Sequence, residues 1–155
     1  MSSRDLNLLH PELRRRVQLV DRDWRREQPG QPRLIVTSGL RTTEEQARLY
    51  AQGRGIPGRI VTRAPAGTSL HEYGLAVDFG FENDTLHEMD WDEQRFKILG
   101  VYIIRYGLEW GGGWVHAEQP FRDLPHAQAP GVTWQQAKVG VQPTWTPLPK
   151  EVASV

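Results

Sequence analysis

Residues 69–81, SLHEYGLAVDFGF, constrain the fold most strongly, because they place an acid inside the pattern of a buried strand. Apolar side chains alternate through this run as they do in a half-buried strand, yet Asp78 stands between Val77 and Phe79. A buried carboxylate is costly unless it is paired, hydrogen-bonded or bound to a cation. The sequence therefore predicts a partner for Asp78, and the nearest candidate is His71.

Length and composition limit what this strand can belong to. The 155 residues suit one domain that buries about two-thirds of its unfolded surface. A formal net charge of zero argues against a nucleic-acid partner, and the absence of cysteine leaves only His, Asp and Glu as metal ligands. No segment approaches the roughly 18 apolar residues of a membrane span, and the first 16 residues lack the apolar core of a signal peptide. We expect a monomer that is made in the cytoplasm.

Periodicity and turn residues predict a mixed chain. We expect helices over 11–27, from a cap at Thr42 or Thr43 to about residue 52, over 91–106, and after a cap at Thr133. We expect strands over 34–39 and 75–81, a short one over 59–62, and others near 108–114 and His126. Irregular loops between these elements favour an α+β fold, in which one small domain has a central antiparallel sheet with flanking helices. That domain would span residues 1–140, and the Pro-rich residues 141–155 would form an extended tail.

The first predicted helix is rich in arginine. Acids interleave with its basic residues, so the pattern favours a mixed, solvated helix face over a nucleic-acid-binding patch. The charged residues concerned are Arg14, Arg15, Arg16, Asp21, Arg22, Asp23, Arg25, Arg26 and Glu27.

A metal site would explain the acid in the strand. Gly74 permits a tight turn that could bring His71 and Asp78 together, and catalytic zinc sites commonly use three protein ligands. The third ligand could be His116, His126 or His87; His126 is favoured because Asp123 precedes it by three residues as a possible general base. An ordinary His–Asp hydrogen bond, a turn-capping Asp123, and purely structural roles for Glu109, Trp110 and Trp114 remain alternatives at this point.

Three ordered blocks of the sequence resemble a known peptidase family. Ser69–Asp78 resembles the signature S-x-H-x-x-G-x-A-x-D of the zinc D-Ala-D-Ala and L-alanyl-D-glutamate peptidases, which are related to lysostaphin-type enzymes and to the hedgehog domain. Residues 37–54 resemble the family segment G-x-R-S/T-x-x-x-Q-x-x-L-Y-x-x-G-R, and residues 109–126 resemble its W-G-G and D/E-x-x-H ending. Together the blocks cover about residues 34–128, and their order makes the resemblance specific.

The resemblance implies a role for each matching residue. One zinc ion would be held by His71, Asp78 and His126, with Asp123 as the general base. Arg41 would stabilise developing negative charge or bind a substrate carboxylate, although a simple surface arginine is the alternative. Gln46 and Ser69 match positions that support the site and bind substrate. The family often has Phe after its last histidine, where this chain has Ala127, and Gly113 could not serve as a base if His116 were the ligand instead.

The resemblance also implies a substrate, the stem peptides of bacterial peptidoglycan. The chain looks most like phage endolysins that split the L-Ala–D-Glu bond and reach the wall only when a holin opens the membrane, causing host lysis. A D-Ala-D-Ala carboxypeptidase or dipeptidase is the alternative, and a zinc-containing wall-binding module without catalysis is a further one. The acidic stretch 82–93 could bind a second cation, but a solvated loop is the simpler interpretation.

Overall fold

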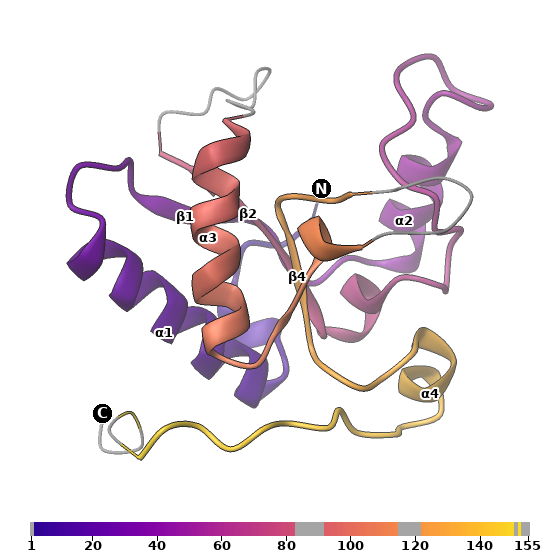
Figure 1. Cartoon of the computed structure of the whole chain (residues 1–155). Coiled ribbons are helices and arrows are strands. Elements are labelled where there is room, and N and C mark those ends of the chain that lie inside the picture. Colours follow the sequence, from indigo (N-terminus) through magenta and orange to yellow (C-terminus); the bar gives the residue numbers. More distant parts are fainter. Residues whose placement is uncertain (1, 83–91, 115–121, 151, 153–155) are drawn as a thin grey trace.

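The fold is α+β, as the sequence predicts, and a four-stranded antiparallel sheet lies at its centre (Figure 1). A computed structural model describes residues 2–82, 92–114, 122–150 and 152. The strands are β1 (Leu34–Ser38), β2 (Ala76–Phe81), β3 (Glu109–Trp110) and β4 (His126–Gln128), in the order β1-β2-β4-β3. The helices are α1 (Pro11–Glu27), α2 (Thr43–Ala51), α3 (Glu93–Arg105) and α4 (Trp134–Lys138), with short 3-10 turns η1 (Leu6–Leu8), η2 (Leu70–Tyr73) and η3 (Gly111–Gly113).

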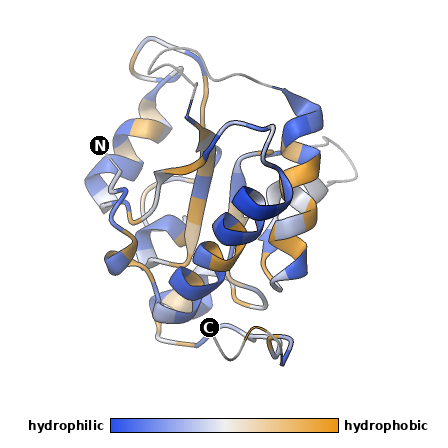
Figure 2. Ribbon diagram, turned by 90° about the vertical axis from the view of Figure 1, so that its left-hand side faces the viewer, coloured by the Kyte–Doolittle hydropathy of each residue, from blue (hydrophilic) through white to orange (hydrophobic). Residues whose placement is uncertain are grey.

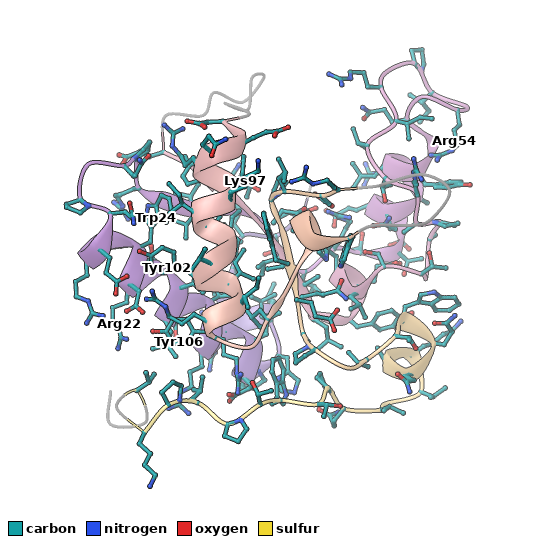
Figure 3. All side chains as sticks on the ribbon, in the orientation of Figure 1. Arg22, Trp24, Arg54, Lys97, Tyr102 and Tyr106 are labelled. Atoms are coloured by element: carbon teal, nitrogen blue, oxygen red, sulfur yellow. The ribbon has the colours of Figure 1, made fainter. Side chains whose placement is uncertain are left out.

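One face of the sheet carries the main core. Alternation along β2 directs Val77, Phe79 and Phe81 to the side that α1 and α3 cover, and all three side chains are buried there. Trp24 of α1 meets Tyr102 of α3 edge to face over this core (Figure 3). Hydrophilic residues dominate the outward side of the helices (Figure 2). Burial of one helix stripe against one sheet face is the arrangement that amphipathic helices favour.

The opposite face of the sheet carries polar side chains in two rows. The antiparallel register pairs Asp78 with both Ser38 on β1 and His126 on β4. The next row pairs Gln128 of β4 with Glu109 of β3. Because side chains alternate between faces, Asp78, His126 and Gln128 all point away from the main core, which contains Val77 and Ala127. This alternation explains how an acid is accommodated within an apolar strand.

Most predicted elements are confirmed, with corrections at their ends. The helix 11–27 is found as expected, and Thr133 caps α4 with a capping box. The cap of α2 is Thr42, which makes Glu45 the third helical residue and so the partner in the capping box; Gln46 is completely buried. Residues 59–62 form no strand, and α3 begins two residues later than expected, since Asp92 caps its first turn.

The expectation of a mixed, solvated helix face on α1 is wrong at two positions, since Arg16 and Asp23 are each only 2% exposed. Asp23 accepts hydrogen bonds from the Tyr106 hydroxyl and from Arg22, Arg26 and Arg105. The other expected charges lie at the surface as predicted, for example the ion pair between Arg25 and Asp21. Helix packing against α3 has therefore drawn one acid of this face into a closed cluster.

The chain beyond α4 lies along the domain. It runs beneath α1 in Figure 1, and Trp145 packs against the main core. Arg16 donates to the backbone carbonyl of Thr146, and its guanidinium lies 5.1 Å from the Trp145 ring centroid. The described part of the tail is thus laid on the domain, and the domain boundary at residue 140 stays a prediction. Within the described residues, no helix is long and apolar enough to cross a membrane.

Candidate metal centre

Two histidines meet one carboxylate on the open face of the sheet. The β2–β4 register sets Asp78 directly beside His126, whose Nδ1 lies 3.3 Å from Asp78 Oδ1. The same carboxylate oxygen lies 3.4 Å from His71 Nε2. Candidate ligand atoms of all three residues fall within 4.8 Å of one another. The structure therefore brings together the three residues for which the sequence predicts a ligand role.

His71 is placed by a short turn that its neighbours cap at both ends. Ser69 caps the start of η2, where its hydroxyl accepts from the His71 amide while Glu72 accepts from the Ser69 amide. Gly74 ends the turn in the left-handed region, with φ at 67°, and a side chain there would press on the Leu8 carbonyl oxygen at 3.1 Å. A residue without a side chain is needed at this close turn. Ser69 thus orients the ligand segment and also lines the cleft described below.

The hydrogen bonds of His71 decide which ring nitrogen is free. Its Nδ1 lies 2.9 Å from the backbone carbonyl oxygen of Gly39, which can only accept, so Nδ1 must carry the proton. The Nε2 lone pair then faces the Asp78 carboxylate. A lone pair and a carboxylate repel each other unless a cation lies between them, so the site requires either added protons or a metal ion. An ordinary neutral His–Asp hydrogen bond, the simpler alternative, does not fit this geometry.

The donor set and its distances fit zinc. Two imidazoles and one carboxylate are a common zinc ligand set. Zinc bonds of about 2.0–2.1 Å in a tetrahedron place neighbouring ligand atoms about 3.3 Å apart. The two His–Asp78 distances, 3.3 and 3.4 Å, agree with that spacing.

A second carboxylate lies beside this group. Asp123 Oδ2 is 4.0 Å from His126 Nδ1, and its side chain is about one-third exposed to the cleft. Burial and the neighbouring charge of Asp78 raise the pKa of Asp123. Burial also raises the pKa of Asp78. When the two rings carry the added protons, the charge of His71 and the hydrogen bond from His126 outweigh burial and hold that pKa far below its ordinary value. The pKa of Asp78 is thus lowered, so that Asp78 stays an anion. The pKa of Asp123 is raised, so that Asp123 can exchange a proton more readily.

The triple glycine holds Asp123 close to the metal ligands. The Gly111 carbonyl accepts from the Asp123 amide, and a Cβ on Gly111 would approach the Asp123 carbonyl oxygen to 2.4 Å. The carbonyl of Asp123 in turn accepts from the His126 amide. Only glycine permits this approach, which explains why the W-G-G block and the D-L-P-H block occur together.

Arg41 turns toward Asp78. Its Nη2 lies 3.6 Å from Asp78 Oδ2 and donates to the Ser38 hydroxyl, while its Nη1 donates to Gln46 Oε1 at 2.7 Å. Arg41 is thus largely buried but still lines the cleft, unlike the surface arginine that was the alternative. Gln46 is completely buried, where it accepts from Arg41 and donates to the Ala64 carbonyl. It therefore supports the site by orienting Arg41, and direct contact with substrate stays a prediction.

An open cleft of about 950 Å³ is lined by His71, Asp78, Asp123 and His126. Residues 61–64 and 68–70 line one part of the cleft, and residues 131–136 line another. Trp114 contributes as well, and its ring lies 4.9 Å from the His126 ring. A cleft of this volume can admit a short peptide.

Sequence reasoning missed three residues of this site: Glu109, Trp114 and Gln128. The first two were interpreted as core or strand-edge residues, and Gln128 was not considered. Its position two residues after His126 on one strand could have placed both on the same face. The rival ligands His87 and His116, and most of the acidic stretch 82–93, lie outside the described residues.

Comparisons with known proteins identify the family of this chain. The family model VanY, D-alanyl-D-alanine carboxypeptidase, matches residues 7–117, which is more than half of the chain. The chain belongs to the VanY family. The match includes His71 and Asp78 and ends before Asp123 and His126.

Among curated relatives, the peptidoglycan L-alanyl-D-glutamate endopeptidase CwlK of Bacillus subtilis is 37% identical over 103 residues. The matched region covers 61% of this chain and 59% of CwlK, so the chain spans about three-fifths of that relative's length.

Two solved structures share the fold. The Serratia marcescens L-Ala D-Glu endopeptidase ChiX has a TM-score of 0.54 at 22% identity, covering 83% of this chain and 87% of ChiX. A mutant of the vancomycin-resistance D,D-pentapeptidase VanY in complex with Zn(II) has a TM-score of 0.54 at 19% identity, covering 84% of this chain and 76% of VanY.

Proposed function

We propose that this VanY-family chain is a zinc peptidase that hydrolyses the L-Ala–D-Glu bond of peptidoglycan stem peptides. The observation that carries the proposal is the convergence of His71, Asp78 and His126 on one point, with Asp123 beside them in the cleft. The choice of bond follows from similarity to CwlK, a peptidoglycan L-alanyl-D-glutamate endopeptidase. Zinc suits the donor set, and a related VanY structure was solved with Zn(II).

His71, Asp78 and His126 would hold the zinc ion. When bound, zinc acts as a Lewis acid on a carbonyl group and lowers the pKa of an attacking water.

Asp123 would serve as the general base. It would accept a proton from the attacking water and deliver that proton to the leaving amine of D-Glu, and its position 4.0 Å from His126 Nδ1 supports this role. The raised pKa of Asp123 suits a group that must both take up and release a proton. Arg41 would add a fixed positive charge at the cleft, where it steadies Asp78 and favours negative charge that develops on the substrate.

We further propose that the enzyme acts as a phage endolysin that lyses its host. Four features of that role stay predictions: cytoplasmic synthesis, holin-dependent release to the wall, a monomeric state and antimicrobial use.

The second candidate function is trimming of terminal D-Ala, because the matching family model is that of the D-alanyl-D-alanine carboxypeptidase VanY.

One peptidoglycan digest distinguishes the two candidate functions. Purified protein is incubated with intact peptidoglycan, with and without a zinc chelator, and the products are analysed by mass spectrometry. A free D-Glu amine together with a free L-Ala carboxyl group supports the endopeptidase. Released D-Ala favours the carboxypeptidase, and the absence of any chelator-sensitive product would rule out both and leave the wall-binding module.

A further inference from the structure

Gln128 and Glu109 form a cross-strand pair beside the metal ligands. They lie directly opposite each other in the β3–β4 register, on the same face as His126. Gln128 Nε2 donates to Glu109 Oε2 at 3.0 Å, and Gln128 Oε1 lies 2.8 Å from His126 Nε2. The other oxygen of Glu109 accepts from the Gly131 amide at 3.2 Å. A continuous chain of hydrogen bonds thus joins Glu109 to a metal ligand.

Glu109, at the end of this hydrogen-bond series away from His126, fixes which group donates and which accepts in each bond. An ionised carboxylate can only accept, so Glu109 requires the NH₂ group of Gln128 to point toward it. The amide oxygen of Gln128 must then point toward His126. Because that oxygen can only accept, His126 Nε2 must carry a proton, and the lone pair of a neutral ring is left on Nδ1. This is the nitrogen that faces Asp78 Oδ1.

We propose that the Glu109–Gln128 pair is a positioning device that sets the tautomer and ring orientation of His126, so that Nδ1 is available to the metal. The proposal rests on the proposed function, because it assumes that zinc is the occupant. It adds two residues to which neither sequence reasoning nor the comparisons assign a role.

The two ligand histidines depend on different kinds of partner. His71 is fixed by the backbone carbonyl of Gly39, which no side-chain substitution removes. His126 is fixed by a side-chain amide, which would stabilise the wrong tautomer if it reversed. The anion of Glu109 prevents that reversal. The metal affinity is therefore expected to respond to Gln128 and Glu109.

Substitution of both residues tests the device. Gln128→Met removes the acceptor while keeping the length of the side chain, and we expect zinc affinity to fall about 10- to 100-fold, as for other partners of metal ligands. Glu109→Gln keeps the shape but lets the Gln128 amide reverse, and we expect a smaller loss of zinc affinity.

The double variant Glu109→Gln/Gln128→Glu exchanges the two groups. The amide at position 109 can donate to the new carboxylate, which still accepts from His126 Nε2. The double variant should therefore recover affinity relative to Gln128→Met.

Zinc affinity is measured by competition with a chromophoric chelator, and folding by circular dichroism. Gln135→Met is the matched control, because Gln135 lines the same cleft outside this hydrogen-bond chain; its affinity for zinc should equal that of the wild type. Long-range ¹H–¹⁵N spectra of the metal-free protein at alkaline pH should show the His126 proton on Nε2 in the wild type and a mixture of tautomers in Gln128→Met.

Affinity within twofold of wild type in Gln128→Met would overturn the proposal, as would a proton on Nδ1 in the wild-type spectra. A double variant no better than Gln128→Met would do the same. Failure of the proposed function looks different, since the wild-type chain itself would then bind no zinc. The tautomer spectra still test the Glu109–Gln128 pair in that case.

Discussion

Two acids are drawn into the interior of this domain, and their surroundings are opposite. Asp23 on α1 is closed off, with a side chain that is 2% exposed, and Tyr106 and three arginines donate to it. Figure 3 shows Arg22 and Tyr106 from this cluster at the α1–α3 contact. Asp78 on β2 is 23% exposed in the cleft, and two ring nitrogens and an arginine at 3.6 Å surround it.

The comparison shows how the same residue type serves structure or chemistry. Every neighbour of Asp23 named above is a donor, so the carboxylate is satisfied by the protein alone. The Nε2 of His71 faces Asp78 with a lone pair, so Asp78 still requires a cation. We expect substitutions at Asp23 to change stability and substitutions at Asp78 to change metal binding and activity.

Asp78→Asn should have the largest effect. The amide is a poor zinc ligand, so bound zinc is lost and, with it, several kcal/mol of Lewis-acid stabilisation, which corresponds to a fall in kcat/KM of more than about 10³-fold. Peptidoglycan digestion and the zinc content of the same sample measure the two effects. Full activity in this variant would refute the assignment of Asp78.

Asp123→Asn should separate catalysis from metal binding. It removes the general base, so kcat should fall about 10²- to 10³-fold, while the zinc content per chain stays that of wild type. Turnover of a soluble stem peptide and metal analysis of the same sample test this. Wild-type turnover would show that Asp123 is not the base.

Asp23→Asn should leave the metal centre intact and lower stability. The three arginines lose their charged acceptor, but their side chains are 33–64% exposed and can turn to water, so we expect a loss of about 1–3 kcal/mol instead of the full cost of breaking a buried pair. Denaturant unfolding measures the loss, and zinc content is the control. A loss of zinc with unchanged stability would contradict the structural role that we assign to Asp23.

The stability that Asp23 contributes should depend on pH. Burial raises the pKa of Asp23, but the hydrogen bonds from Tyr106, Arg22 and Arg105 outweigh it and lower that pKa below its ordinary value. A lowered pKa means that the contribution is present above the unfolded value, about pH 3.9, and is lost as the pH falls through the folded value. The stability difference between wild type and Asp23→Asn should therefore be constant from about pH 7 to 5 and shrink below about pH 4. A difference that grows on acidification would contradict this sign.

The grouping of His71, Asp78 and His126 could be predicted from sequence because each position follows from a local pattern or from a family block. Alternation places Asp78 on the open face, Gly74 permits the turn after His71, and the D-L-P-H block carries Asp123 and His126. The fold class followed from the mixture of helical and strand periodicities. These features involve residues that are close in sequence.

Features that depend on packing between distant elements could not be predicted. The burial of Asp23 requires Tyr106 and Arg105 to come from α3, and the role of Gln128 requires Glu109 to lie opposite it across β3 and β4. The burial of Gln46 likewise depends on the carbonyl of Ala64 in a loop that carries no periodic signal. Register between strands and contact between helices are set by tertiary structure, which the local pattern does not specify.

The central claim is that Asp78 and two histidines together require a cation. X-ray absorption at the zinc edge of the loaded wild-type chain tests it most directly. We predict one zinc per chain, with two imidazole nitrogens and carboxylate or water oxygens at about 2.0–2.1 Å. A chain that takes up no zinc, or zinc whose shell contains no imidazole, would contradict the account.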